Sequence, residues 1–478
     1  MDALQSRAEE ELGHADFAHS ARTTRAVAIW EQLAAAPKGT VAEAFPVAAE
    51  RKGAYRFLES KAVLWEPLAE AIHQATARRC REHAMVLVPV DGSSAAHTDT
   101  RRDDGVGPIG SRKAGGRGLK SMIALAMSYD GVPLGIGAHV LWARAETANP
   151  TPHARRTLDA KESRWWTELQ VQFEAALKSE GAHTLPWYQM DREADTSHVL
   201  MRGIKPGTLV TVRSNHNRLL TAKTGRRKHL KLHAAIAAAP AMGALYLLVP
   251  RGIKRQERVA RLEVRVVPVE LELRTLWSHT WLANVPITAV EVREVVTCPD
   301  GEEPLKWLLL TTYPTKTLDD AVQVVRGYAL RWQIERLHYT WKTGTCQVEQ
   351  SQLESFGALC KWATLHLSVA ADRQHALHLS RTQPELPATE VFEREEIDAA
   401  LTLYTQHRLD APRPGTTPSL GTLVDIIARL GGYAGKTSGG PPGIKLFARG
   451  MERVEVAALA LRLQRQLEQA PTSTDGSG

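Results

Sequence analysis

The order of apolar segments between residues 85 and 214 constrains the fold more than any other feature of this sequence. Short apolar runs bounded by turn residues predict five strands, at 85–90, 121–128, 133–142, 183–190 and 208–214. Helical periodicity predicts one helix at 159–179, before the fourth strand, and another at 192–202, before the fifth. Three strands, a helix, a strand, a helix and a strand make a mixed α/β layer.

After this layer the spacing of apolar residues changes twice along the sequence. Residues 259–273 alternate strongly between apolar and polar side chains, and 286–296 and 305–312 continue the pattern of strands. From 318 to 342 the period becomes helical, as it is in residues 1–72 and again at 353–379, 419–430 and 451–467. The expected fold is therefore an α/β mixed-sheet core with a β-rich insertion, flanked by helical N- and C-terminal parts.

Composition excludes several classes of protein. Of the 478 residues, 43% are hydrophobic and 24% are charged, which rules out disorder of the whole chain. The four cysteines are scattered, which argues against a disulfide scaffold or a tetrahedral zinc site and fits a reducing compartment. The longest weakly polar run, 234–250, is broken by Pro240 and Gly243, so it predicts a short helix and a buried strand at 244–249 and no membrane segment.

The charge of the chain is a weak sign of nucleic acid, and its placement says more. The formal net charge is only +7, but basic residues gather at 22–56, at 101–120, at 218–231 and on the helix at 328–342. The segment 218–231 holds six Lys and Arg and no acid. We interpret it as a track for a DNA backbone, although a solvated loop would give the same pattern.

Two aspartates follow predicted strands directly. Asp91 comes after the strand at 85–90 and before Gly-Ser-Ser, and Asp191 comes after the strand at 183–190. A strand end followed by a turn projects a carboxylate rigidly. Taken singly, each aspartate is more often a turn or cap residue.

The predicted helix at 318–342 carries a third carboxylate among cations. Tyr328, Arg331, Glu335 and Lys342 lie at offsets of 0, +3, +7 and +14, which places them within an arc of about 60° on one helix face. Phosphate contacts use Arg, Lys and Tyr donors, and a divalent metal uses carboxylate oxygens. The alternative is an ordinary polar helix face with intrahelical ion pairs.

Taken together, the three carboxylates predict a metal-dependent site for chemistry at phosphorus. Carboxylates that converge from two strands and a helix can hold two Mg²⁺ ions about 3.5–4 Å apart. Such a pair activates an attacking oxygen and stabilises the leaving oxygen. No arrangement of serine or cysteine suggests a protein nucleophile.

Several stretches of the chain resemble a known family. They are GAYRF at 53–57, VDGSS at 90–94, KES at 161–163, MDREAD at 190–195, VRS at 212–214, EEPLKWLLLTT at 302–312, RWQIERLHYTWKTG at 331–344 and IARLGG at 427–432. With Tyr328, the last long stretch completes the pattern Y-x2-R-x3-E-x6-K. In these motifs the chain resembles bacterial DDE transposases of the insertion-sequence-four family.

This resemblance implies a domain organisation. It places a helical DNA-end-binding domain at 1–72, and an α/β catalytic domain with a ribonuclease-H-like mixed sheet at 73–368, with its β-rich insertion at about 219–312. A helical dimerisation domain follows at 369–470, and residues 471–478 are expected to form a disordered tail.

The resemblance also implies residue roles. Asp91, Asp191 and Glu335 match the catalytic metal-binding triad of the family. The implied DNA contacts are Tyr328, Arg331 and Lys342 at the phosphates, Trp307 on a flipped base, Arg213 beside the active site, and Arg22, Arg25 and Arg56 in the N-terminal domain. Without the resemblance, Trp307 would be interpreted as a strand residue that packs in a core. Gly92 departs from the family, which has a polar residue after the first aspartate.

The implied activity is cut-and-paste transposition. The cofactor is Mg²⁺, with Mn²⁺ as a substitute and two ions per active site. The partners are double-stranded DNA, as transposon ends and as target, and a second copy of the chain in a synaptic homodimer; no membrane is involved. Cleavage passes through a DNA hairpin, and the expected location is the bacterial cytoplasm, at the nucleoid. Two alternatives remain: a catalytically silent DNA-binding regulator of transposition, and a metal-dependent DNA nuclease without strand transfer.

Overall fold

The structure is a computed structural model of the chain. It describes residues 3–97, 105–110, 115–145, 157–221, 230–249, 256–274, 281–295, 298–299, 301–405, 412–435 and 440–469. The basic segments at 101–120 and 218–231 lie only partly within these ranges, and the tail at 471–478 lies outside them.

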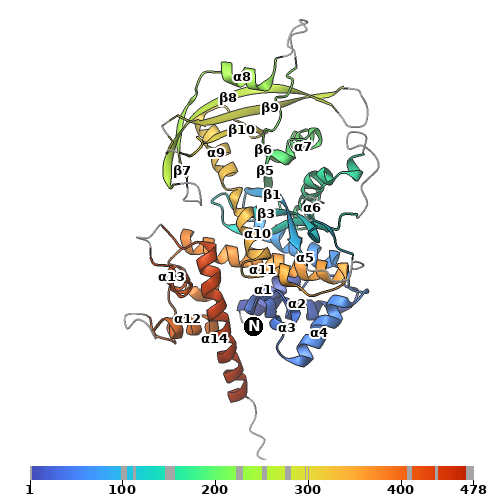
Figure 1. The fold of residues 1–478 in the computed structure, drawn as a ribbon, viewed down its shortest axis with the longest axis vertical. Coiled ribbons are helices and arrows are strands. Elements are labelled where there is room, and N and C mark those ends of the chain that lie inside the picture. Colours follow the sequence, from blue (N-terminus) through green and yellow to red (C-terminus); the bar gives the residue numbers. More distant parts are fainter. Residues whose placement is uncertain are drawn as a thin grey trace, which may run out of the picture.

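A single mixed sheet extends from the middle into the upper part of the molecule as drawn in Figure 1. Within the described residues it has ten strands, in the order β2-β3-β1-β5-β6-β10-β9-β8-β7, with β4 paired to β3. The strands are β1 (Met85–Ala96), β2 (Gly107–Pro108), β3 (Arg117–Met127), β4 (Pro133–Trp142), β5 (Leu185–Met190), β6 (Leu209–Arg213), β7 (Gly243–Val249), β8 (Arg258–Arg274), β9 (Trp281–Glu294) and β10 (Lys306–Thr311). The predicted α/β class with a mixed sheet is confirmed.

The strand directions set where the carboxyl ends of the strands meet. Strands β4, β3 and β1 pair in antiparallel fashion, whereas β5 runs parallel to β1 and β6 parallel to β5. This arrangement is consistent with the predicted ribonuclease-H-like core. Because β1 and β5 run parallel up to the pair Val90–Met190, the residues that follow this pair lie side by side, at the carboxyl end of β5.

The β-rich interval extends this sheet. Strand β10 pairs with β6, and β9, β8 and β7 follow outward in antiparallel order. The prediction that 244–249 is a buried strand is wrong in its burial: Tyr246 is 69% exposed and Leu248 63% exposed. Successive side chains of a strand point to opposite faces of the sheet, so Leu245 and Val249 pack on the core while Tyr246 and Leu248, on the other face of β7, are exposed.

Helices cover both faces of the sheet. The α-helices are α1 (Ala3–Leu12), α2 (Ser20–Ala35), α3 (Val41–Ala44), α4 (Ala48–Glu59), α5 (Glu66–Cys80), α6 (Trp165–Ser179), α7 (Ser197–Gly203), α8 (Leu232–Ala238), α9 (Leu318–Ala329), α10 (Trp332–Lys342), α11 (Phe356–Thr382), α12 (Arg394–Thr405), α13 (Leu420–Leu430) and α14 (Ile444–Gln469). Short 3-10 helices are η3 (Leu158–Ala160), η4 (Glu162–Arg164), η5 (Arg192–Ala194), η6 (Val348–Gln350) and η7 (Ala388–Glu390).

Alternation along β1 divides the core in two. Leu87 lies in a cluster with the N-terminal helices and α11, whereas Val86 and Val88 lie in a cluster with α6 and α7. A strand that is buried on both faces is apolar at nearly every position, which is why 85–90 was recognisable as one uninterrupted apolar run.

Three predicted helices are shorter than expected. The segment at 159–179 is α-helical only from Trp165, after the 3-10 turns η3 and η4. The segment at 318–342 is two helices, because Leu330 and Arg331 form a tight joint in which the Arg331 N–H donates to the Tyr328 carbonyl at 3.1 Å. The segment at 192–202 is the 3-10 turn η5 followed by α7. In the last two places an i→i+3 hydrogen bond replaces the α-helical pattern.

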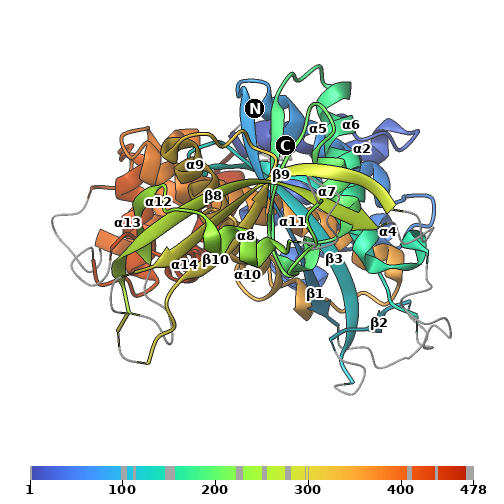
Figure 2. The ribbon, with the colours of Figure 1, turned by 90° about the horizontal axis from the view of Figure 1, so that it is seen from above.

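The C-terminal helices form a third apolar cluster, built from α12, α13, α14 and the end of α11. Both views place α12–α14 on the opposite side of the molecule from α6 and α7 (Figures 1 and 2). Helix α5 runs across the predicted domain boundary at residue 72, and α11 runs across the one at 368. In the described part of the chain, no helix has both the length and the apolar character needed to cross a membrane.

Candidate active site

Asp91 lies inside a strand. The expectation that the first strand ends at residue 90 is wrong, because β1 continues to Ala96 with β3 as its partner, and Asp91 stands opposite Ile123. Pairing with β5 stops at Val90, however, so the Asp91 carboxylate emerges where β1 loses its parallel neighbour. The strand persists because β3 still supplies hydrogen-bond partners for its backbone.

Asp191 lies at a strand end, as predicted. It follows the last residue of β5, and its Oδ1 accepts a hydrogen bond from the Glu193 N–H at 2.8 Å, which caps η5. The parallel register Val90–Met190 places Asp191 beside Asp91. The interpretation of Asp191 as a cap is therefore confirmed, and its catalytic role stays a prediction.

Glu335 lies in the first turn of α10, and Arg331 joins it to Asp91. The Arg331 guanidinium lies 3.2 Å from Asp91 Oδ2 and 3.5 Å from Glu335 Oε1. The Arg331 and Asp91 side chains are 11% and 16% exposed, and that of Glu335 is 39% exposed. One guanidinium thus pairs with two carboxylates at the edge of solvent, and its single positive charge does not balance both of theirs.

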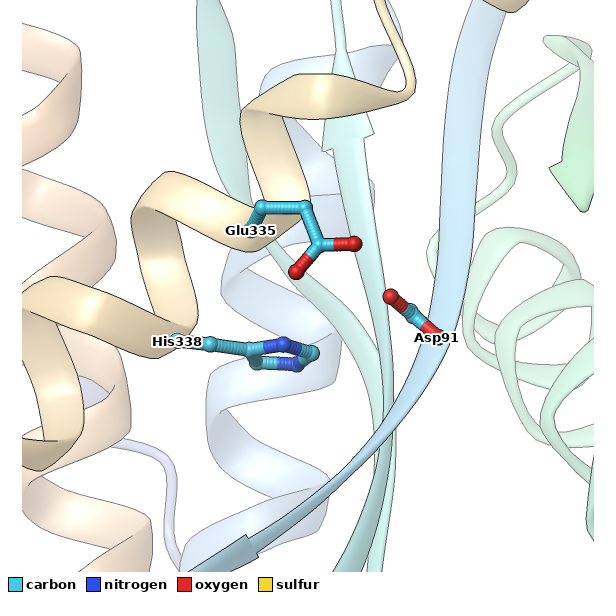
Figure 3. A group of neighbouring side chains, drawn as sticks. All are labelled: Asp91, Glu335 and His338. Atoms are coloured by element: carbon cyan, nitrogen blue, oxygen red, sulfur yellow. The ribbon is translucent and has the colours of Figure 1, made fainter. Parts of the chain in front are cut away.

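A histidine belongs to the same group. Asp91, Glu335 and His338 each offer one ligand atom within 4.8 Å of the others, from β1 and from one face of α10 (Figure 3). Our reading of the sequence missed His338. The Glu-x-x-His spacing was the signal that could have identified it, because residues three apart share a helix face. Among the described residues this group does not include Asp191.

The electrostatics of the group fit a divalent cation. Burial raises the pKa of Asp91 to about 7; Arg331 opposes this shift, and Glu335 and Asp191 add to it. Burial lowers the pKa of His338 to about 3, with Lys342 and Arg331 contributing. Carboxylate oxygens and an uncharged imidazole nitrogen are donors for Mg²⁺ or Mn²⁺, and a cation would relieve the repulsion between the carboxylates.

A cationic groove lies beside the carboxylates. It has a volume of about 730 Å³, and its lining includes Arg192, Arg213, Arg265, Arg293, Lys306, Trp307, Tyr328, Arg331 and Trp332. Tyr328 is only 5% exposed and meets Trp307 edge to face, with ring centroids 5.3 Å apart. Trp307 therefore packs partly against the core, as its alternative interpretation held, while it still lines the groove.

Two further residues of this region were not anticipated. Trp332 is 59% exposed at the start of α10, and the Arg331 guanidinium lies 5.9 Å from its ring centre. Glu349 in η6 accepts the Ala96 N–H at 2.9 Å and lies 3.7 Å from the Lys342 ammonium. Lys342, on the same helix as Glu335, is thus held at the end of β1.

The predicted N-terminal contacts lie on the helices α2 and α4. Arg25 in α2 and Arg56 in α4 are exposed. The Arg22 guanidinium donates to the carbonyls of Phe17 at 3.0 Å and Ala62 at 3.2 Å, so part of its hydrogen-bonding capacity stabilises the fold.

Three family models match the chain. Residues 5–63 match transposase DNA-binding, residues 171–370 match the transposase DDE domain, and residues 369–470 match the transposase Tn5 dimerisation domain. The second match contains Asp191 and Glu335, whereas Asp91 precedes its first residue. The N-terminal match contains Arg22, Arg25 and Arg56.

Proposed function

We propose that this chain, which its three matched domains indicate to be a DNA-binding DDE transposase, performs cut-and-paste transposition. It would cleave transposon ends through a hairpin intermediate and join the 3′-OH ends to target DNA. Its motifs favour the insertion-sequence-four family, nearest to the Tn-five transposase. The observation that carries this proposal is the Asp91–Arg331–Glu335 group beside a cationic groove.

Asp91, Asp191 and Glu335 would hold two Mg²⁺ ions, for which Mn²⁺ can substitute. When bound, such ions supply activation of an attacking oxygen and stabilisation of a leaving oxygen in substitution at phosphorus. The carboxylates must be ionised to bind them, and Asp91 has a raised pKa in the metal-free chain. This supports a site that is built for added positive charge.

The cations of the groove would bind the DNA backbone. Arg331 lies between the two carboxylates, so it can turn its remaining N–H donors toward a phosphate without leaving the site. Arg213 and Tyr328 line the same groove. These donors would position the scissile phosphate relative to Asp91 and Glu335.

Two tryptophans suit the handling of an unpaired base. Trp307 and Trp332 both line the groove, and Trp332 presents most of its indole to solvent. A hairpin forces bases at its turn out of the stack, and an aromatic surface stabilises an unstacked base by about 1–3 kcal/mol. Trp307 is the residue that we expect to take this role during hairpin formation.

The flanking domains would bring two ends together. Exposed Arg25 and Arg56 lie in the matched DNA-binding segment and would contact transposon-end DNA. In the matched dimerisation segment, α14 exposes Val456 and Leu463, which are two helical turns apart on one face. A synaptic homodimer through this face, in the bacterial cytoplasm at the nucleoid, completes the proposal.

The test uses the full-length chain and a duplex that carries the terminal repeat found beside its gene. We expect Asp91→Ala and Glu335→Ala to abolish Mg²⁺-dependent cleavage while DNA binding, measured by mobility shift, stays within about threefold of wild type. Full cleavage by either variant would overturn the site assignment. Absence of wild-type cleavage would favour a silent regulator, and cleavage without joining of pre-cut ends to a plasmid would favour a nuclease.

A further inference from the structure

His338 is a buried polar group that the proposed mechanism leaves without a task. Its side chain is 7% exposed, and its Nε2 has no hydrogen-bond partner within the described part of the chain. A buried polar atom without a partner costs roughly 1–3 kcal/mol, so such atoms call for an explanation.

The position of the imidazole supplies one. Figure 3 shows the His338 ring close to the carboxylates of Glu335 and Asp91. Glu335 and His338 project from one face of α10, and α10 packs on β1, which supplies Asp91. Two rigid elements thus bring two oxygen donors and one nitrogen donor within 4.8 Å of one another.

We propose that His338 is a ligand, together with Asp91 and Glu335, of one divalent cation bound at this site. The inference rests on the proposed function for the presence of a metal and adds a nitrogen donor to its carboxylates. Asp191, whose Oδ1 caps η5 and which stands outside this group, would then serve chiefly the second ion.

The nitrogen donor has a chemical consequence. Mg²⁺ prefers a shell of oxygens, whereas imidazole favours later divalent metals such as Co²⁺, Ni²⁺ and Zn²⁺. A site made of two carboxylates and one imidazole should therefore bind Mn²⁺ and Co²⁺ more tightly than Mg²⁺, and the imidazole should account for much of that preference.

The test measures Mn²⁺ bound to the full-length protein without DNA, by pulsed electron paramagnetic resonance. Wild-type protein should show nitrogen modulation from a bound imidazole, and labelling with ¹⁵N-histidine should change it to the ¹⁵N pattern. His338→Gln should lose the modulation and weaken Mn²⁺ binding by at least roughly 10-fold, because the loss of even an outer-shell partner of a ligand commonly costs 10–100-fold. His366→Gln, a change at a buried histidine of α11 outside the group, should keep both.

The outcomes are separable. Wild-type Mn²⁺ binding that depends on Asp91 but shows no histidine nitrogen would overturn the proposal, as would modulation that survives His338→Gln. The labelled wild-type measurement remains decisive even if a variant fails to fold. A histidine signal in a chain that does not cleave DNA would contradict the proposed function and leave the ligand assignment intact.

Discussion

At the scale of single residues, Arg331 makes the carboxylate site possible. Its guanidinium contacts Asp91 and Glu335 across the junction between β1 and α10. Without it, two partly buried carboxylates would repel each other in the metal-free chain, and burial already raises the pKa of Asp91 to about 7. The same residue adjoins the exposed ring of Trp332, so charge and stacking surface meet at one position.

Trp307 offers the first prediction at this scale. Trp307→Ala should nick transposon ends at the wild-type rate but form hairpins about 10–100-fold more slowly, because base stacking contributes about 1–3 kcal/mol. Trp307→Phe should recover part of the loss, since it keeps an aromatic face and the contact with Tyr328. Separate quantification of nicked and hairpin products on a denaturing gel checks this. An unchanged hairpin yield would remove the role in base stacking.

At the scale of elements, the site depends on two irregularities. Strand β1 continues past its pairing with β5, and two residues, Leu330 and Arg331, separate α9 from α10. The first carries Asp91 into the site on a paired strand, and the second sets Arg331 at the start of α10. The 3-10 turn η6 then ties the far end of β1 to the far end of α10 through Glu349, Ala96 and Lys342.

Glu349 provides the prediction for this scale. Glu349→Ala should raise affinity for DNA severalfold at low salt, because it frees the Lys342 ammonium for a phosphate. The ion pair is partly exposed, so the free energy of unfolding should fall by less than about 1 kcal/mol. Fluorescence anisotropy with labelled DNA across a salt series measures the effect. Glu390→Ala, which removes an exposed acid elsewhere, is the control; an equal rise there would mean that only net charge matters.

Part of this organisation was predictable from local pattern. The apolar runs of β3, β4 and β5 and the position of Asp191 at a strand end follow from periodicity and turn residues close in sequence. The end of β1 was not predictable in this way, because Gly92–Ser93–Ser94 resembles a turn unless β3 is there to pair with it. The exposure of Tyr246 was likewise not predictable, because it depends on which face of β7 packs on the core.

At the scale of the whole molecule, a buried ionic group joins the N- and C-terminal helices. The Arg373 guanidinium in α11 donates to the Ala34 carbonyl at the end of α2 and to Glu396 of α12 at 3.2 Å, and it lies 3.6 Å from Glu455 of α14. All three charged side chains are at most 3% exposed. Such a group is costly to desolvate, so its contribution depends on which carboxylate carries charge.

This arrangement makes stability depend on pH. Burial raises the pKa of Glu455 from 4.5 to about 8, with Arg373 opposing the shift. The folded chain therefore holds a proton that the unfolded chain has lost between these values, and the free energy of unfolding should fall as pH rises through this window. Glu455→Gln removes this titration without changing shape. As the pH rises from 5 to 9, the free energy of unfolding of the variant should increase relative to that of wild type by up to a few kcal/mol, since each pKa unit is about 1.4 kcal/mol.

Chemical denaturation of both proteins at several pH values checks this prediction. Glu396→Gln is the comparison, because Glu396 makes the closer contact with Arg373 and the loss of its carboxylate should destabilise the chain. A constant difference between wild type and Glu455→Gln at all pH values would show that Glu455 is not protonated in the folded chain.

Self-association is the last prediction at this scale. Val456 is 66% exposed and Leu463 47% exposed on α14, which extends past the other C-terminal helices (Figure 1). Val456→Glu with Leu463→Glu should weaken dimerisation on end DNA by at least about tenfold, because burial of each side chain is worth roughly 1.5–3 kcal/mol. Sedimentation velocity measures it, with exposed Gln464→Glu as the control. An undiminished dimer would place the interface elsewhere.

The sequence by itself determined the chemistry that is available. It carries Asp91, Asp191 and Glu335, the cations around them, the α/β class and the helical flanks, because residue types and short periodicities are local properties. Only the tertiary structure decided how these residues combine: that Arg331 joins two carboxylates, that His338 shares their space while Asp191 caps a turn, and that β7 is an edge. The reason is physical, since these relations depend on which surfaces of distant segments pack together, and that is decided by burial of the whole core.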